Sequence, residues 1–146
     1  MTNSLHVLFK LDGAEYVIAA ADVLHMETFS GATRVPGTAP HVAGVMQIRR
    51  RVVPVIDVRQ RFGLPSITPT LDSRVVVVQD GTRAVGLLVD SAREVVRIDE
   101  STFQDPPDII DHQAGGFVKK LTQSGKRLLL LIDFRKLITE ETTHGG

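Results

Sequence analysis

Five histidines are candidate side chains for catalytic or metal chemistry in this 146-residue chain. None is paired with another at the i, i+4 or His-x-His spacing of zinc sites, and none has a carboxylate at a ligand-like interval. The chain has no Gly-x-Ser-x-Gly motif and no glycine-rich phosphate loop followed by Lys. The sequence therefore predicts a protein that is not an enzyme and has no metal and no cofactor. The histidines are His6, His25, His41, His112 and His144.

Three aspartates could be imagined as catalytic acids, but each falls at the end of an apolar strand-like run. Asp57 and Asp133 stand where a helix N-cap is favourable, which predicts short helices over residues 57–62 and 133–137. Asp90 follows the run AVGLLV, where a solvated or capping carboxylate is the commoner case. A further helical turn is expected near Ala39–Ala43.

Arginine is concentrated in one part of a chain whose net charge is zero. Residues 33–63 hold six arginines against a single acid, Asp57. Three of the six, Arg49–Arg51, stand between two apolar runs, so a tight turn there would contain no glycine. A nucleic-acid interface is one interpretation, but single-strand binding usually adds aromatic stacking surfaces, and only Phe62 lies nearby. A small β-barrel that binds nucleic acid through Arg49–Arg51 therefore stays an alternative.

Three turn dipeptides separate β-branched, apolar runs, and each predicts a β-hairpin. They are Asp12-Gly13, Asp80-Gly81 and Ser124-Gly125. The segments YVIAAADVLHM and AVGLLVDSAREVV follow the first two turns at an offset of about 69 residues. We expect an all-β protein of two small barrels that arose by duplication, with halves of roughly 14–70 and 71–139 in a single domain spanning 1–146.

The chain has no cysteine, no basic region ahead of an apolar core at its N-terminus, and no apolar run near the roughly 20 residues that span a bilayer. A cytoplasmic protein without membrane insertion is expected.

The stretch GVMQIRRRVVPVIDVRQRFGLP resembles the signature of the CheW-like family, the coupling proteins of bacterial chemotaxis. That signature reads Gly-Val-x-Asn-Leu-Arg-Gly-x-(Val/Ile)-(Val/Ile)-Pro-Val-(Ile/Val)-Asp-Leu-Arg. Upstream, EYVIAAADVLHMETFSGATRVPGTAP is similar to the family's tyrosine-containing strand, its Val-x-Glu-Ile step and its Val-Pro. Downstream, AVGLLVDSAREVV and KRLLLLIDFRKLI resemble its Val-Gly-(Leu/Ile)-x-Val-Asp strand and its closing strand and helix. The resemblance covers about residues 5–139.

The resemblance implies two five-stranded, SH3-like β-barrel subdomains that share a core and have a few short helices. It also implies a non-catalytic adaptor that couples the cytoplasmic tips of chemoreceptors to the regulatory domain of a sensor histidine kinase. A diverged adaptor that serves another two-component pathway is the alternative within this family.

Two positions depart from the signature: Arg50 stands where it has Gly, and His25 stands where it has Glu. Gln47 in place of Asn is a milder change. If Arg50 adopts the positive φ that glycine supplies, the strain is about 1–2 kcal/mol. Both larger changes shift the surface toward positive charge, which suits a more acidic partner.

The residues expected to contact partners come from three segments. We expect Val23 and Met26 to pack in the core, with residue 25 facing outward, and Gly44 to permit close backbone packing. The full set of predicted partner-binding residues is Val23, His25, Gly44, Gln47, Arg49, Arg50, Asp90 and Glu94.

Overall fold

β-Strands make up most of the computed structural model, which describes residues 3–108 and 116–143, with side chains up to residue 138. The strands are β1 (Asn3–Leu11), β2 (Ala14–Ala19), β3 (Val23–Thr28), β4 (Val42–Ile48), β5 (Arg51–Asp57), β6 (Arg74–Asp80), β7 (Arg83–Val89), β8 (Ser91–Asp99), β9 (Val118–Ser124) and β10 (Arg127–Ile132). The short helices are η1 (Ala20–Asp22), α1 (Val58–Arg61), η2 (Glu100–Thr102) and α3 (Phe134–Thr143).

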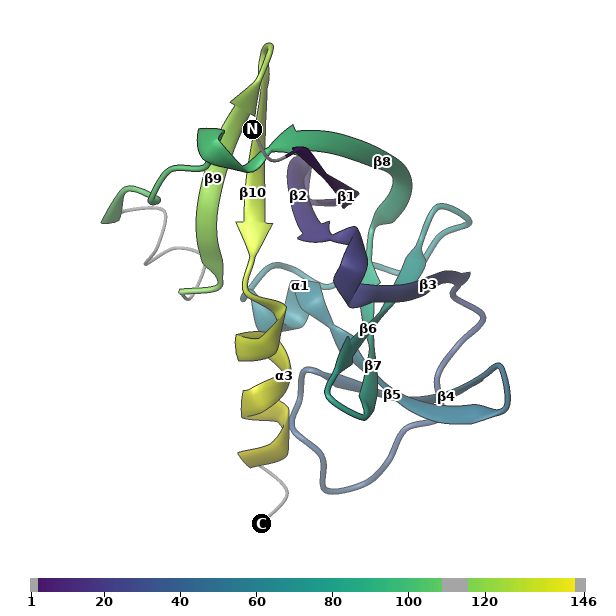
Figure 1. Ribbon diagram of the computed structural model, residues 1–146. Coiled ribbons are helices and arrows are strands. Elements are labelled where there is room, and N and C mark those ends of the chain that lie inside the picture. Colours follow the sequence, from purple (N-terminus) through teal and green to yellow (C-terminus); the bar gives the residue numbers. More distant parts are fainter. Residues whose placement is uncertain (1–2, 109–115, 144–146) are drawn as a thin grey trace.

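The strands form two five-stranded sheets (Figure 1). Sheet A has the order β8-β1-β2-β10-β9, and sheet B has the order β3-β6-β7-β5-β4. The expected fold class is confirmed: the protein is mostly β, with two five-stranded sheets and short helices.

All three predicted hairpins form, but two turns lie one residue later than the dipeptides suggested. Asp12–Gly13 is the first loop, with φ of 51° and 83°. Asp80 and Ser124 instead end their strands, so the loops are Gly81–Thr82 and Gly125–Lys126. In these two loops glycine, with φ of 62° and 63°, occupies the first loop position.

The predicted repeat is visible in the strand pairing. Leu11 pairs with Ala14 at the end of the first hairpin and Asp80 with Arg83 at the end of the second, and each position differs by 69 residues. Each sheet takes strands from both halves of the chain, since β1 and β2 join β8–β10 while β6 and β7 join β3–β5. The subdomain halves 14–70 and 71–139 stay a prediction.

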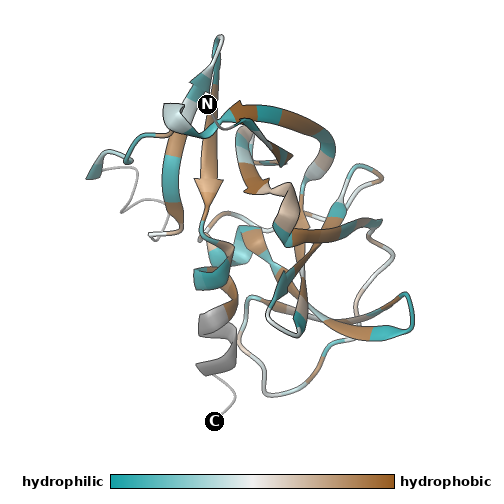
Figure 2. Ribbon diagram, in the orientation of Figure 1, coloured by the Kyte–Doolittle hydropathy of each residue, from teal (hydrophilic) through white to brown (hydrophobic). Residues whose placement is uncertain are grey.

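One hydrophobic core is shared by the two sheets, and each sheet has a smaller core of its own. Phe9 and Ile18 of sheet A pack in the shared core with Val76 and Leu87 of sheet B, and all four are essentially buried. Side chains alternate between the two faces of a strand, so neighbouring residues of β6 serve different cores. Figure 2 shows the resulting apolar runs along the strands.

Two short helices begin at the predicted caps. The Asp57 side chain accepts a hydrogen bond from the Gln60 N–H at 3.3 Å, and Asp133 accepts one from the Lys136 N–H at 3.2 Å. These bonds satisfy first-turn donors that have no partner within the helix. Residues 39–43 form no helix; a turn closed by Val42 N–H and Ala39 C=O leads directly into β4.

Candidate docking surface

The tip of the β4–β5 hairpin is a two-residue loop made of Arg49 and Arg50. Ile48 pairs with Arg51, and the loop residues have φ of 49° and 69°. Positive φ at both loop positions is the property of a type I′ turn, which matches the twist of the strands but normally selects Asn-Gly. Arg50 therefore adopts the strained conformation and does not change the turn.

The arginines of this tip have different partners. Arg49 Nη2 lies 3.8 Å from the Glu27 carboxylate of β3, and the Arg49 side chain is 67% exposed. Arg51 Nη2 donates to the Thr82 carbonyl oxygen at 3.3 Å, a contact that neutralises no charge. Arg50 is exposed and has no hydrogen bond or ion pair within the described residues. The tip thus presents positive charge to solvent. The end of this hairpin is coloured hydrophilic in Figure 2.

Gln47 lies next to this tip on β4, and its side chain is exposed. Its partner across the hairpin is Val52, which is 72% exposed. An exposed valine beside three arginines gives the hairpin an apolar contact next to its charges. We call the surface formed by residues 47 and 49–52 the arginine tip.

Strand β3 is an edge strand of sheet B, and its exposed face differs from the prediction. Leu24 and Met26 are 40% and 36% exposed, whereas Val23 is half-buried against the shared core. The expectation that Met26 packs in the core is wrong: although Met26 pairs with the buried Val76, β3 is the edge strand of sheet B, and the Met26 side chain stays partly open to solvent. His25 is also half-buried rather than fully outward, and its Nε2 is buried without a hydrogen-bond partner within the described residues.

Gly44 allows another segment of chain to approach β4. Its φ is 144°, and a Cβ there would lie 2.2 Å from the Thr33 carbonyl oxygen. Two backbone hydrogen bonds between Thr33 and Val45, at 2.9 and 2.8 Å, hold this approach. The prediction of close backbone packing at Gly44 is confirmed.

Asp90 lies where the two sheets meet and is bound by an arginine of α1. Arg59 donates from Nε and Nη2 to its two carboxylate oxygens at 2.7 and 2.8 Å, and the Asp12 N–H donates to the same carboxylate at 2.9 Å. Arg59 Nη1 also donates to the Pro65 carbonyl oxygen at 2.8 Å. Burial raises the pKa of Asp90, but these hydrogen bonds and the guanidinium charge outweigh it, so the pKa lies below its usual value.

Glu94 lies on β8 in sheet A and belongs to a partly exposed charge cluster. Arg127 donates to Glu94 at 3.0 and 3.1 Å and to Glu15 at 3.1 and 2.6 Å. Hydrogen bonds from Arg127 lower the pKa of both glutamates, although burial opposes the shift. By the 69-residue offset, Glu94 is the counterpart of His25.

The comparisons with known proteins agree with this architecture. The CheW-like domain family matches residues 5–142. This chain belongs to the CheW-like family. Its members are non-catalytic scaffolds that couple receptors to a kinase in chemotaxis.

Two relatives and a solved structure also match this chain over most of its length. The chain is 30% identical over 145 residues to the chemotaxis protein CheW of Bacillus subtilis, covering 99% of this chain and 93% of the relative. It is 30% identical over 138 residues to that of Thermotoga maritima, covering 94% and 83%. The crystal structure of the scaffolding protein TtCheW from Thermoanaerobacter tengcongensis matches with a TM-score of 0.83 and 27% identity over 90% of each chain.

The structure brings some of the predicted residues together and separates others. Gln47, Arg49 and Arg50 share the arginine tip, and the Arg49–Glu27 contact connects that tip to the strand that carries Val23 and His25. Two further predicted residues lie elsewhere: Asp90 lies between the sheets and Glu94 lies on sheet A.

Three exposed apolar residues near this surface were missed by sequence reasoning. Leu24 and Met26 alternate with half-buried residues along β3, but their exposure also depends on β3 being an edge strand of the assembled sheet. Val52 begins an apolar run after three arginines, so the sequence pattern alone suggests a buried residue. Its exposure depends on the register of the hairpin, which pairs it with the exposed Gln47.

In the part of the chain that the structure describes, no three His, Asp or Glu side chains gather so as to hold a metal ion. His112 and His144 lie outside the described residues. Across residues 3–108 and 116–143, no helix has the length and apolar character needed to cross a bilayer.

Proposed function

We propose that this CheW-like protein is a cytoplasmic adaptor that binds the regulatory domain of a chemotaxis histidine kinase and the tip of a chemoreceptor. The observation that carries the proposal is the arginine tip, which the Arg49–Glu27 contact connects to β3, the edge strand on which Leu24 and Met26 are exposed. A charged rim next to an apolar strip suits a protein partner, since charges orient the encounter and apolar contacts hold it.

The exposed face of β3 supports the receptor contact. Leu24 and Met26 form an apolar row on an edge strand, and a helix can lay its apolar face on such a row. A receptor tip is a helical hairpin, so its helices have the shape that this strip accepts.

The arginine tip supports a partner with an acidic surface. Arg50 adds a charge where the family signature has glycine, and Arg51 keeps its charge because its partner is a carbonyl group. We therefore expect the kinase domain or receptor of this pathway to carry more acidic residues at the contact than a conventional partner.

A nucleic-acid function has less support. None of the chain's six phenylalanines and one tyrosine is exposed in the structure. Phe62, the aromatic residue nearest the arginines in sequence, stacks on Phe117 with ring centroids 5.5 Å apart. Single-strand binding uses exposed aromatic faces, and the arginine tip has none.

Calorimetric titration with the regulatory domain of the host's kinase tests the proposal. We expect saturable one-to-one binding that weakens between 50 and 500 mM salt, conditions chosen to screen exposed charges. Arg50→Glu should weaken binding at least tenfold, and the matched control Arg97→Glu, on an exposed arginine of β8, should leave it unchanged. Absence of binding by the unaltered chain, or binding of a single-stranded oligonucleotide in its place, would overturn the proposal.

A further inference from the structure

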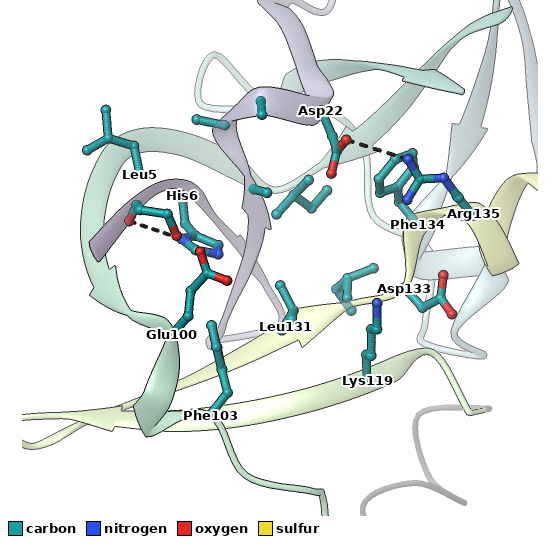
Figure 3. A pocket seen from close by; sticks show the side chains of 16 residues that line it. Leu5, His6, Asp22, Glu100, Phe103, Lys119, Leu131, Asp133, Phe134 and Arg135 are labelled. Atoms are coloured by element: carbon teal, nitrogen blue, oxygen red, sulfur yellow. Dashed lines mark hydrogen bonds and ion pairs between the residues drawn. The ribbon is translucent and has the colours of Figure 1, made fainter. Parts of the chain in front are cut away.

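A cavity of about 520 Å³ opens on the inner face of sheet A, away from the arginine tip. Figure 3 shows that β1, β2, β10 and the segments around η1 and η2 surround it. The ion pair between Asp22 and Arg135, at 3.6 Å, lies at one side. The volume is within the roughly 300–1,000 Å³ of pockets that hold small ligands or single anchoring groups.

The repeat explains why sheet A has this cavity. At an offset of 69 residues, His6 corresponds to Val75 and Ala19 to Leu88. Val75 is fully buried in the inner core of sheet B, and Leu88 packs against that core. Sheet A has a polar ring and a methyl group at the two positions, and both residues line its cavity. The space that sheet B fills with its own side chains is therefore open in sheet A.

His6 presents an acceptor to this space. The side chain is 3% exposed, and Nδ1 lies 3.3 Å from the Ser4 carbonyl oxygen. A carbonyl oxygen only accepts, so Nδ1 carries the hydrogen, and in that tautomer Nε2 is an acceptor. Nε2 has no hydrogen bond within the described residues, and the buried Ser4 Oγ has none there either. A buried polar group normally has a hydrogen-bond partner, so Ser4 Oγ is a group that a ligand can satisfy, and His6 Nε2 is a second atom without a partner in the described part of the chain.

Two charged residues at the cavity lie apart from the ion pair at its side. Glu100 lies beside His6 on one side of Leu131, and Lys119 lies on the other side (Figure 3). Neither charge has an ion pair within the described part of the chain. Phe103 and Leu131 supply apolar surface between them. Hydrogen-bond acceptors thus lie at one end of the cavity, the Lys119 ammonium group lies at the other, and apolar side chains lie between them.

We propose that this cavity binds an extended polypeptide segment of a protein partner, which inserts one large apolar side chain. The backbone N–H of the segment donates to His6 Nε2, and a carbonyl oxygen accepts from Lys119 or Ser4 Oγ. The inserted side chain takes the place that Leu88 fills in sheet B. The site is on sheet A, so it goes beyond the proposed function, whose contacts are on sheet B.

Nuclear magnetic resonance titration of the full-length, ¹⁵N-labelled chain tests the proposal. The probes are N-acetyl-leucinamide and N-acetyl-phenylalaninamide, with N-acetyl-glycinamide as a control that lacks the side chain. We expect saturable shifts of the amide signals of His6, Lys119 and Leu131 with the first two probes, and at least tenfold weaker binding of the control.

Ala19→Leu gives sheet A the leucine that sheet B has at the corresponding position, Leu88. This variant should abolish the saturable shifts, while signals far from the cavity stay in place. Because that variant could disturb folding, Lys119→Glu serves as a second one and should weaken binding severalfold. Lys126→Glu, at the exposed β9–β10 turn, is its matched control and should not. Unsaturable shifts with the unaltered chain, equal binding by folded Ala19→Leu, or binding of free leucine but not of its blocked form would each overturn the proposal.

Discussion

Replacing Asp90 by Asn should destabilise the protein markedly, because Asp90 is the charge partner of an almost buried arginine. The Arg59 side chain is 10% exposed and that of Asp90 is 22% exposed. Removing one member of a buried pair costs about 3–5 kcal/mol, whereas exposed pairs are worth about 0–1 kcal/mol. Asp12 at 3.5 Å and the Pro65 carbonyl remain beside the guanidinium, so we expect a loss of about 2–3 kcal/mol.

The unfolding free energy lost in Asp90→Asn should depend on pH in a defined direction. The pKa of Asp90 is lowered in the folded protein, so its contribution is present above the unfolded pKa of about 4 and is lost as pH falls through the folded pKa. The difference in unfolding free energy between Asp90→Asn and the unaltered chain should therefore be full at pH 7 and smaller near pH 2–3.

Urea unfolding at pH 7 and at low pH measures both quantities. The expected loss corresponds to a melting temperature lower by about 4–12 °C for a chain of this size. Asp105→Asn is the matched control, because Asp105 pairs with Lys120 but is 84% exposed. A loss at pH 7 below about 1 kcal/mol, or one equal to that of the control, would refute the view that this pair joins the two sheets.

Three further changes have expected outcomes. Arg50→Gly should raise the free energy of unfolding by about 1 kcal/mol in urea unfolding, because glycine relieves the positive φ of 69°; an unchanged or lower value would contradict the strained turn. Gly44→Ala should lower the melting temperature strongly, because its Cβ would lie 2.2 Å from the Thr33 carbonyl oxygen, and a shift of less than about 2 °C would show that the segment moves aside freely. Arg127→Met should lower the melting temperature at low salt and less so in 1 M salt, because salt screens its exposed contact with Glu94; a salt-independent effect would point to packing.

Features that depend on a few neighbouring residues could be predicted from the sequence. Asp57 and Asp133 were identified as caps because an N-cap needs only its own helix turn. The three hairpins followed from turn residues between apolar runs, although the loops at Gly81 and Gly125 began at the glycine. The all-β class and the repeat followed from the same local signals.

Features that depend on distant contacts could not be read in this way. Arg59 and Asp90 are 31 residues apart, and no local pattern in either segment indicates that the two side chains pair. The exposure of Met26 depends on β3 being an edge strand, a property of the assembled sheet. Similarly, the cavity beside His6 becomes visible only when the register aligns the two halves.

The most direct test of the adaptor role is whether the chain couples a receptor to a kinase. A receptor signalling fragment held on vesicles is mixed with the host's kinase, with and without this protein, and the vesicles are sedimented. We predict that the kinase sediments with the receptor only when the chain is present, and that Arg50→Glu reduces this recruitment while Arg97→Glu does not. Equal sedimentation of the kinase with and without the chain would contradict the account.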